Sequence, residues 1–567
     1  MLLRAILICF SFLNAAPSFA FGQQTQLLQH LWEVDPPLGD IWKSEQQSRQ
    51  IHFDANSLTS RSVEDRLKIA QLICREHANP SFKQRELSIK LLIERLEAGE
   101  DNIHVRRAMF SAAVLVGDSS HAEVLWSLAK SDSAVATLVE RALSRWKSPL
   151  ANAVWRQRLG DVTVKPTDLA IALEGLAVTG NAEDNEALQN VIRANHTSGA
   201  NKYLAAVALA MLVPEGLNEF AQQVIDSDLD QRYLIAAQVL CQHSGEKTAI
   251  QLGAILKDGP ASAQLIAFGS MVDRMPDAAR EFATQLVTHA DNGLRTMVLK
   301  LLRNFADSDS LRLQSTLLSD RHPEVRRLAA MCLLEKAAQG HRSIVDESVL
   351  SHITSESWTG IEQAIVVAVG LRDRSYCKVF LRLLDHPRPE VNMHAGWALM
   401  EVADESEILA SMLEYVKKMT DELTAKGLAP PLRHTDLIRL SYLHEAFGKN
   451  LYHPAAETLA KYIPKNGYRL GNISRSSAIW ALGKLNKGKD DAELRSKLND
   501  RIGDFTPVEP EDYLVRFACI LALGEMAQPD SRDVIEMYLE PLPRPLGYAA
   551  QWALSQIDRA SIQKTTE

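Results

Sequence analysis

A helical segment recurs along the chain at multiples of about 31 residues. Its clearest copy is DRHPEVRRLAAMCLLEKAA at residues 320–338. Each copy has an aliphatic residue followed by arginine, and these arginines are separated by 189, 31 and 190 residues: Arg106, Arg295, Arg326 and Arg516. A period of 31 residues holds two short helices and two turns. Such a unit cannot enclose a core by itself, so the pattern predicts stacked helix pairs.

The spacing within residues 320–338 predicts how one such helix is oriented. Five apolar side chains follow the i, i+3, i+4, i+7, i+8 pattern of a single helical face: Val325, Leu328, Ala329, Cys332 and Leu333. Pro323 suits the first turn, where a missing amide hydrogen has no cost. Arg326, Arg327 and Glu335 lie off the apolar stripe, so they are predicted to face solvent while Cys332 packs in the core.

A second recurring motif is the triplet Trp-Ala-Leu, which begins at Trp397, Trp480 and Trp552. These tryptophans share the inward stripe with alanine and leucine, which favours core packing over a ligand platform. Between the landmarks, helices of roughly ten to eighteen residues are separated by combinations of Gly, Pro, Asn and Asp. No stretch alternates with period two, so strands are expected to be nearly absent. The predicted fold is all-α, an α-solenoid of stacked antiparallel helix pairs.

The N-terminal end and one internal segment depart from this rhythm. Residues 1–20 have a charge, a short apolar run and small residues, the layout of a signal peptide cleaved after Ala20. Residues 21–60 are predicted to form an N-terminal arm or cap, and the solenoid is predicted over 61–420. Residues 421–437 contain Pro430-Pro431 and should bend it, with further repeats over 438–567. No later stretch is apolar enough to predict a transmembrane segment.

The charge balance disfavours nucleic acid as a partner. The chain has 62 basic and 71 acidic residues, a net charge of −9, and loss of Arg4 with the signal would make it −10. Affinity for nucleic acid comes mainly from basic side chains that neutralise phosphates. The most basic stretch, Arg141 to Arg158, contains Trp146 and Trp155 and is interpreted as ordinary helices with charged outer faces and buried aromatics.

Five cysteines remain after the signal, and they are far apart: Cys74, Cys241, Cys332, Cys377 and Cys519. None forms a CxxC pair, and most lie inside apolar helical stretches. A disulfide framework or a zinc site would need paired spacings. We therefore interpret them as small buried hydrophobic residues, with one long-range disulfide as the open alternative.

The residues of the repeat resemble a known family. Asp320, Pro323, Val325 and Arg326, followed by an alanine-rich helix, resemble HEAT repeats. The 31-residue period with the segments LALGEM and WALGKL is most similar to the short variety named after phycobilisome lyases. The resemblance implies that Asp320 and Arg326 are structural residues of a ladder along the inner turns. Other units lack one or both residues, so a continuous ladder does not follow.

One region offers an enzymatic alternative. His434, His444, Glu445 and His453 lie within twenty residues, and His444-Glu445 resembles a motif that ligates iron in deoxyhypusine hydroxylase, a HEAT-repeat enzyme. That family needs four such pairs, and this chain has one. Glu445 with Lys449 is interpreted more simply as a solvated i,i+4 ion pair. A bilin lyase is the other enzymatic alternative. A HEAT-like DNA glycosylase would need a basic groove, which the charge balance disfavours.

The sequence therefore predicts no catalytic, cofactor-binding or metal-binding residue and no cofactor. No HExxH, GxSxG, P-loop or Rossmann motif is present. Asn195 and Asn472 match the glycosylation acceptor pattern, but Asn472 is interpreted as a helix cap. The function that we expect is an exported, non-catalytic scaffold whose protein partner binds the concave solenoid face.

Overall fold

The computed structural model describes residues 55–78, 82, 84–425, 434–465, 470–539 and 545–566. Within these ranges every regular element is helical, as the repeat predicts, and none is a strand. The described helices belong to two compact units that divide between Leu313 and Gln314, inside α19. We call them the N-terminal unit and the C-terminal unit.

The N-terminal unit begins with the short 3-10 helix η2 (Ala55–Thr59). Its α-helices are α4 (Val63–Glu76), α5 (Arg85–Glu97), α6 (Ile103–Val116), α7 (Ala122–Ala129), α8 (Ala136–Arg145), α9 (Asn152–Gly160), α10 (Pro166–Thr179), α11 (Asn185–Arg193), α12 (Gly199–Leu212), α13 (Asn218–Ile225), α14 (Arg232–Leu240), α15 (Glu246–Asp258), α16 (Ala261–Arg274), α17 (Pro276–Leu286), α18 (Asn292–Leu302) and α19 (Ser308–Thr316).

The C-terminal unit continues the same alternation. Its α-helices are α20 (Pro323–Lys336), α21 (Arg342–Ile353), α22 (Trp358–Gly370), α23 (Cys377–Leu383), α24 (Pro389–Val402), α25 (Ser406–Ala425), α26 (His434–Lys449), α27 (Ala456–Ala460), α28 (Asn472–Leu485), α29 (Ala492–Ile502), α30 (Tyr513–Met526), α31 (Arg532–Glu536) and α32 (Pro545–Thr566).

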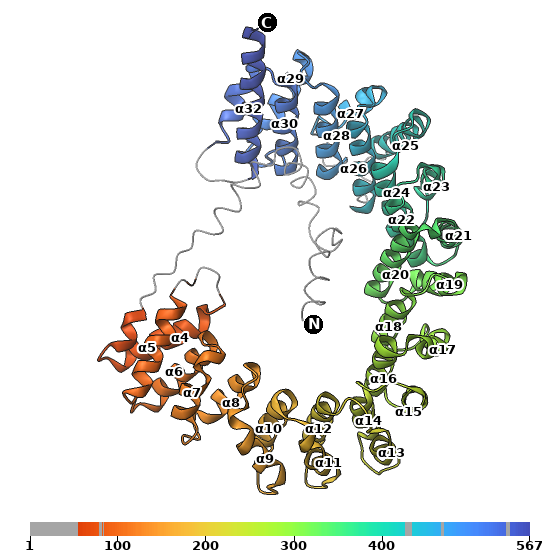
Figure 1. The fold of residues 1–567 in the computed structure, drawn as a ribbon. Helices are drawn as coiled ribbons and strands as arrows, with labels where there is room; N and C mark the ends of the chain where they lie inside the picture. The colour runs from red at the N-terminus through yellow and green to blue at the C-terminus, as the bar shows by residue number, and fades with distance from the viewer. Residues whose placement is uncertain are drawn as a thin grey trace. The chain divides into compact units, whose positions relative to one another are not determined.

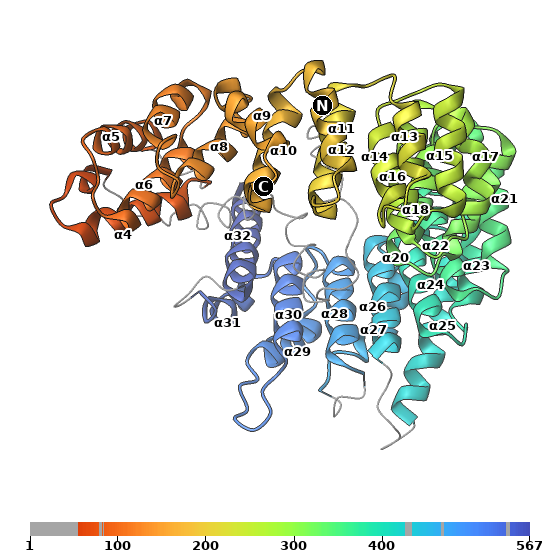
Figure 2. The same ribbon diagram turned by 90° about the horizontal axis from the view of Figure 1, so that it is seen from below.

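Within each unit the helices form two layers (Figure 1). Even-numbered helices stack on one another, for example α10 on α12 on α14, and α26 on α28 on α30. Each odd-numbered helix covers its even-numbered neighbour, as α11 covers α12. Figure 2 shows α26, α28 and α30 side by side. We call these the even layer and the odd layer. In the part of the chain that the structure describes, no helix is long and apolar enough to span a membrane.

The helix predicted at residues 320–338 is α20, and it begins at Pro323 as expected. Cys332 is 7 % exposed and lies in the core, which confirms that prediction. The prediction for Arg326 was wrong, because this side chain is buried. Its guanidinium turns back toward the helix start, where Nη1 donates to the carbonyl oxygens of Asp320 at 2.9 Å and Arg321 at 3.4 Å.

The repeated arginine has the same task in other helices of the even layer. It stands fourth in its helix in six cases: Arg66, Arg106, Arg295, Arg326, Arg475 and Arg516. Arg295, for example, donates to the carbonyl oxygens of His289 and Ala290, six and five residues earlier. These carbonyls have no partner inside the following helix, so the arginine satisfies them and fixes the turn.

The ladder implied by the resemblance is present as separate rungs. Arg66 pairs with Glu100 at 2.9 Å and Arg106 with Asp132 at 3.0 Å, each across to the turn of the next repeat. Asp320 accepts a hydrogen bond from the amide of His322 at 2.7 Å. The arginine is therefore kept as a clamp on its own turn, and it gains an ionic partner where the next turn supplies a carboxylate.

Close helix packing explains the Trp-Ala-Leu echo in the C-terminal unit. A Cβ atom added to Gly483 would lie 2.5 Å from the Cα of Ala522, and one added to Gly524 would lie 2.9 Å from the Cα of Ala553. The Gly448 position meets Ala481 in the same way, at 2.9 Å. We call these three contacts the glycine–alanine seam. Only glycine permits such an approach of two helix backbones.

The tryptophans lie where core packing predicts them, with one exception. The rings of Trp480 and Trp552 lie against the backbones of Gly448 and Gly524, and both side chains are buried. Trp397 is only half-buried, and its ring meets the edge of the His394 ring at 6.3 Å between centroids.

The solenoid continues past the predicted bend within the C-terminal unit. α25 remains helical to Ala425, and residues 426–433, with Pro430-Pro431, lie outside the described residues. α26 nevertheless packs directly on α24, and Asn450 Nδ2 donates to the carbonyl oxygen of Ala403 at 2.8 Å. The bend stays a prediction. Residues 1–54 also lie outside the described ranges. The predicted signal peptide with cleavage after Ala20, and most of the predicted N-terminal arm, fall within them and stay predictions.

The five cysteines described by the structure are free thiols. Cys332, Cys377 and Cys519 are buried, whereas Cys74 and Cys241 are partly exposed. Burial raises the pKa of Cys377 to about 11 and raises that of Cys519 further. These thiols are therefore poor nucleophiles, in keeping with a packing role.

Candidate functional site: a braced loop on the C-terminal unit

The histidine singled out by the sequence is a core residue. His444 is fully buried in α26, and its Nδ1 donates to the carbonyl oxygen of Ser474 at 3.0 Å. Its ring meets the ring of Tyr462 edge-on, with centroids 4.4 Å apart. Burial lowers the pKa of His444 to about 4, so the side chain is neutral at ordinary pH. Its Nε2 is buried without a hydrogen-bond partner.

The remaining members of that region do not join His444 in a metal site. Glu445 is buried beside the hydroxyl groups of Ser441 and Ser477, at 3.5 and 3.3 Å. The predicted solvated pair of Glu445 with Lys449 was wrong, because α26 turns Glu445 inward and Lys449 lies 3.7 Å from Glu401. His453 is exposed. The side chain of His434 lies outside what the structure describes.

Across the described ranges, no group of three or more His, Cys, Asp or Glu side chains is placed to hold a metal ion. The basic stretch from Arg141 to Arg158 is likewise used within the fold. Arg158 pairs with the buried Glu140 at 2.6 Å, and the indole of the fully buried Trp155 donates to the same carboxylate at 3.0 Å. This confirms the interpretation of the stretch as ordinary helices.

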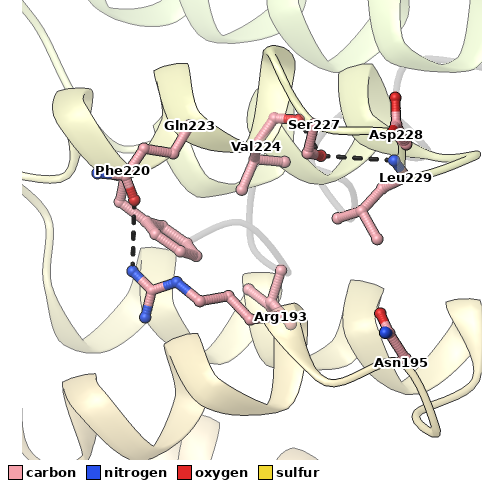
Figure 3. Close-up of a pocket in the computed structure, with 9 residues that line it drawn as sticks. Arg193, Asn195, Phe220, Gln223, Val224, Ser227, Asp228 and Leu229 are labelled. Atoms are coloured by element: carbon pink, nitrogen blue, oxygen red, sulfur yellow. Dashed lines mark hydrogen bonds between the residues drawn. The ribbon is translucent and has the colours of Figure 1, made fainter.

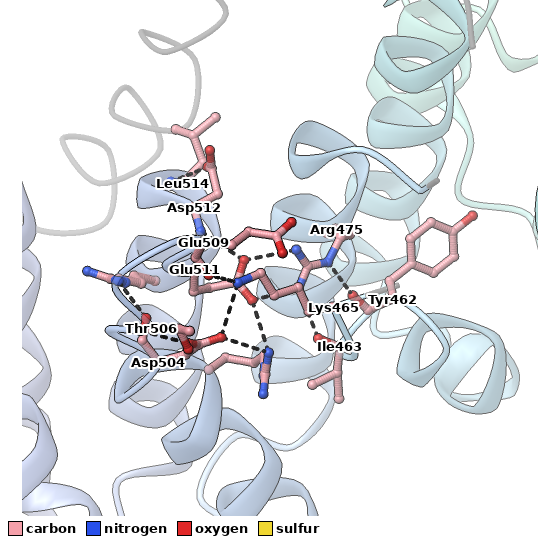
Figure 4. A network of polar contacts seen from close by, with 12 residues as sticks. Tyr462, Ile463, Lys465, Arg475, Asp504, Thr506, Glu509, Glu511, Asp512 and Leu514 are labelled. Carbon is pink, nitrogen blue, oxygen red and sulfur yellow. Dashed lines mark hydrogen bonds and ion pairs between the residues drawn. The ribbon is translucent and has the colours of Figure 1, made fainter. Parts of the chain in front are cut away.

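The most distinctive surface feature is the segment between α29 and α30, residues 503–512, which we call the braced loop (Figure 4). Its C-terminal end is held by a buried ion pair in which Arg475 of α28 contacts both carboxylate oxygens of Glu511, at 2.9 and 2.8 Å. The two side chains are 4 % and 1 % exposed. Arg475 also donates to the carbonyl oxygens of Tyr462 and Ile463 at 3.1 Å.

Asp504 anchors the other end of the braced loop. It accepts a hydrogen bond from the hydroxyl of Thr506 at 2.5 Å and lies 3.4 Å from the ammonium of Lys465. The backbone amide of Glu511 donates to the carbonyl oxygen of Asp504 at 3.0 Å, which ties the two ends together. Lys465 also donates to the carbonyl oxygen of Glu509. The loop is thus fixed at both ends and near its middle.

The charges at the base of the loop are stabilised in their ionised forms. The hydrogen bond from Thr506, together with Lys465, lowers the pKa of Asp504 to about 2. Burial raises the pKa of Glu511, but the hydrogen bonds from Arg475 and the amide of Asp512 outweigh it, so the net shift is downward. Both carboxylates therefore stay ionised at lower pH than free aspartate and glutamate side chains do.

This frame presents apolar side chains to solvent. Val508 is 95 % exposed and Phe505 is 51 % exposed. Phe505 is held in place, because its ring stacks on Tyr538 at 6.2 Å and the guanidinium of Arg516 lies 4.3 Å from its centroid. Met537 and Leu539, on either side of Tyr538 in the chain, are also exposed. Apolar side chains fixed on a rigid frame are typical of protein-binding surfaces, because little entropy is lost when a partner covers them.

A second surface feature, a pocket, lies in the odd layer of the N-terminal unit. Residues of α11 and α13, with the turns that follow each helix, line a pocket of about 380 Å³ (Figure 3). Asn195, one of the two glycosylation acceptor patterns, lies at this pocket and is exposed. The other, Asn472, is the first residue of α28, whose cap is Gly471, with φ at +64° and no side-chain cap bond. The prediction that Asn472 caps the helix was wrong.

Comparison with known proteins identifies the fold of the chain but no activity. No protein-family model matches the sequence, and no curated protein matches it. Among solved structures, a Kap121p mutant is similar, with a TM-score of 0.50 and 12 % identity over 88 % of this chain and 57 % of that chain. Kap95p, described with RanGDP, has a TM-score of 0.49 and 14 % identity over 88 % of this chain and 71 % of that one. Yeast importin-β (Kap95p) has a TM-score of 0.43 and 14 % identity over 89 % and 72 %.

At these identities the similarity concerns the fold alone, and the Kap121p match carries it. Karyopherins are built from HEAT repeats. The stacked helix pairs, the arginine clamp at the start of the even-layer helices and this match agree with one another. The chain is a HEAT-type α-solenoid.

Proposed function

We propose that this chain is an exported, non-catalytic scaffold that binds a protein partner. The observation that carries the proposal is the braced loop, where Val508 and Phe505 are exposed on a segment held by a buried ion pair. The exposed surface of these side chains contributes no stability to the free chain, whereas covering it contributes about 25 cal/mol for each Å² of apolar surface. A partner that covers the loop supplies that gain.

The fold supports the same proposal. In a solenoid, exposed residues of the inner helices and of the turns leading into them select the partner. The braced loop leads directly into α30 of the even layer, so it belongs to this class of turn. We therefore propose that the partner lies against the even layer, the side expected to be concave, and includes the braced loop in its footprint.

Capture of partners with matched variants tests the proposal. The full chain carries Phe505→Ser with Val508→Asp, and the control carries Val162→Asp, at another exposed valine, which is 71 % exposed. We expect a protein captured from the envelope or medium of the source cell to be lost with the loop variant and retained with the control. An identical set of proteins from the loop variant and the wild type would rule out the loop as the binding surface.

Two measurements address the rest of the proposal. Metal analysis of the purified chain should find no stoichiometric iron or zinc; a metal that disappears in a His444→Ala, Glu445→Ala variant would replace the scaffold with the enzymatic alternative. The intact mass of the protein recovered outside the cytoplasm should equal that of a chain beginning at Phe21. A mass that still includes residues 1–20 would contradict export by a cleaved signal.

A further inference from the structure

The pocket between α11 and α13 has an apolar interior. Ile192, Phe220 and Val224 line it and are at most 5 % exposed, and Leu229 lies half-buried at its edge. Figure 3 shows Phe220 and Val224 on one side, with Arg193 and Asn195 on the other. At about 380 Å³ the pocket is near the lower limit of ligand sites, which suits one or two side chains rather than a whole cofactor.

One end of the pocket is closed by Arg193. Its guanidinium lies 4.9 Å from the centroid of the Phe220 ring and donates to Gln189 at 3.0 Å and Gln223 at 3.4 Å. Because the guanidinium is already engaged by these side chains of the odd layer, Arg193 closes the pocket and is a poor ligand for an incoming anion.

The other end of the pocket has the opposite charge. The turn after α13 places three exposed carboxylates at alternate positions: Asp226, Asp228 and Asp230. Asp228 lines the pocket directly. Asp226 accepts a hydrogen bond from Gln222 at 2.9 Å, and the nearby Arg232 donates to the carbonyl oxygen of Ser227 at 3.1 Å. The rim next to Leu229 is therefore net acidic.

We propose that this pocket binds a peptide segment of a protein partner in which an aliphatic side chain stands next to lysine or arginine. The aliphatic side chain packs between Phe220 and Leu229, and the cationic group faces Asp228. This inference rests on the proposed protein-binding function but names a second contact, on the odd layer of the other unit and therefore outside the even-layer footprint proposed above. Charge complementarity selects the basic segment, because an acidic one would meet Asp228 in a turn that carries two further carboxylates.

The test uses a fluorescein-labelled peptide, Gly-Leu-Lys-Leu-Lys-Gly, and the full chain, with binding followed by fluorescence anisotropy. We expect saturable binding that weakens as salt is raised. Replacement of both lysines by glutamate, or of both leucines by serine, should abolish it. Binding that does not saturate at about 1 mM peptide, a very weak affinity, would overturn the proposal. So would equal binding of the serine peptide, since the apolar pocket would then have no part.

Variants at exposed Asp228 and at half-buried Leu229 locate the site. Asp228→Lys should weaken binding by about three- to tenfold, as expected for reversal of one exposed charge. Leu229→Trp, which fills the pocket, should abolish binding. The control Asp277→Lys makes the same charge change at an exposed site on α17 and should have no effect. Equal losses with Asp228→Lys and Asp277→Lys would mean that net charge alone attracts the peptide.

The two proposals can fail separately. The Phe505→Ser, Val508→Asp variant should bind the peptide as the wild type does, because its changes lie on the C-terminal unit. If the peptide fails to bind while partner capture still depends on the braced loop, the pocket proposal is wrong and the scaffold proposal stands. If the peptide binds and capture is insensitive to the braced loop, the loop is ruled out as the binding surface and the pocket proposal stands.

Discussion

The helices α20 and α28 begin in the same way but lie in different environments. Each has an arginine at its fourth position, Arg326 and Arg475, that donates to carbonyl oxygens of the preceding turn. In α20 one side remains open, with Met331 39 % exposed. In α28 every residue from Ser474 to Gly483 is buried. Even-layer helices with the same start can therefore lie partly at the surface or entirely within the core.

A single carboxylate accounts for part of the difference. Glu511 lies 36 residues beyond Arg475, in the turn of the next repeat, and its charge is buried with that of the arginine. Arg326 donates instead to backbone carbonyls of its own turn. The ion pair converts a clamp within one turn into a link between two repeats, and the braced loop depends on that link.

The largest expected effect is the loss of that link. Removing one partner of a buried ion pair typically costs about 3–5 kcal/mol, because the other charge stays buried and uncompensated. We expect Arg475→Met to destabilise the C-terminal unit by that amount, whereas Arg326→Met, which removes hydrogen bonds to carbonyls, should cost about 1 kcal/mol. Urea unfolding, with hydrogen exchange of the α28 amides, measures both. Equal costs would show that Glu511 adds nothing to the clamp.

Acid should weaken the C-terminal unit through His444. Its pKa in the folded chain is about 4 against an ordinary value of 6.5, so the unfolded chain takes up a proton first as the pH falls. Stability is therefore complete above pH 6.5 and falls by about 1.4 kcal/mol per pH unit down to pH 4, roughly 3 kcal/mol in total. The slope between pH 6.5 and 4.5 should disappear in His444→Asn, which keeps a donor for Ser474. An unchanged slope in that variant would assign the effect to other groups.

The glycine–alanine seam should tolerate no added methyl group. In Gly483→Ala the new Cβ would lie 2.5 Å from backbone of α30, so the helices must move apart at a cost of about 1–3 kcal/mol. Gly269→Ala in α16 is the matched control, since its Cβ would meet only the flexible end of Met297 at 3.2 Å. That variant should be neutral or up to about 1 kcal/mol more stable. Thermal unfolding distinguishes them, and a neutral Gly483→Ala would mean that the seam can open freely.

The smallest expected effect is at the cysteines. Cys332→Ala in α20 should cost about 1 kcal/mol by loosening helix packing, and Cys519→Ala in α30 somewhat more, because Cys519 is completely buried. Partner capture by the folded fraction should be unchanged in both. Selective loss of binding by Cys332→Ala at unchanged stability would contradict its role as a core residue.

Local patterns predicted the fold well because they depend on residues within one helix. Pro323 and the stripe that includes Cys332 set the start and the face of α20, and both predictions were confirmed. The errors came where a side chain reaches beyond its own stripe. Arg326 is long enough to turn back to its own preceding turn, so helical spacing misplaced it, and Gly471 took the capping position that Asn472 was expected to hold.

The candidate sites could not be predicted in the same way. The braced loop depends on Arg475 meeting Glu511 across a repeat, and nothing in the local sequence marks that pair. The segment PVEPED, with two prolines and three acids, was the available signal of an unusual loop. The pocket likewise arises from two helices that are not consecutive, with Phe220 of α13 facing Arg193 of α11.

The glycine–alanine seam also has a mechanical consequence. A solenoid bends by small rotations between stacked helices, and such a rotation is easy where long side chains separate the backbones, as Met297 does beside Gly269. Where Gly483 packs on Ala522, the two helix backbones are in direct contact, so no flexible side chain lies between them that could adjust to a rotation. We expect α26 to α32 to move as one stiff segment, so any elastic adjustment to a bound partner should be concentrated in repeats that lack the seam.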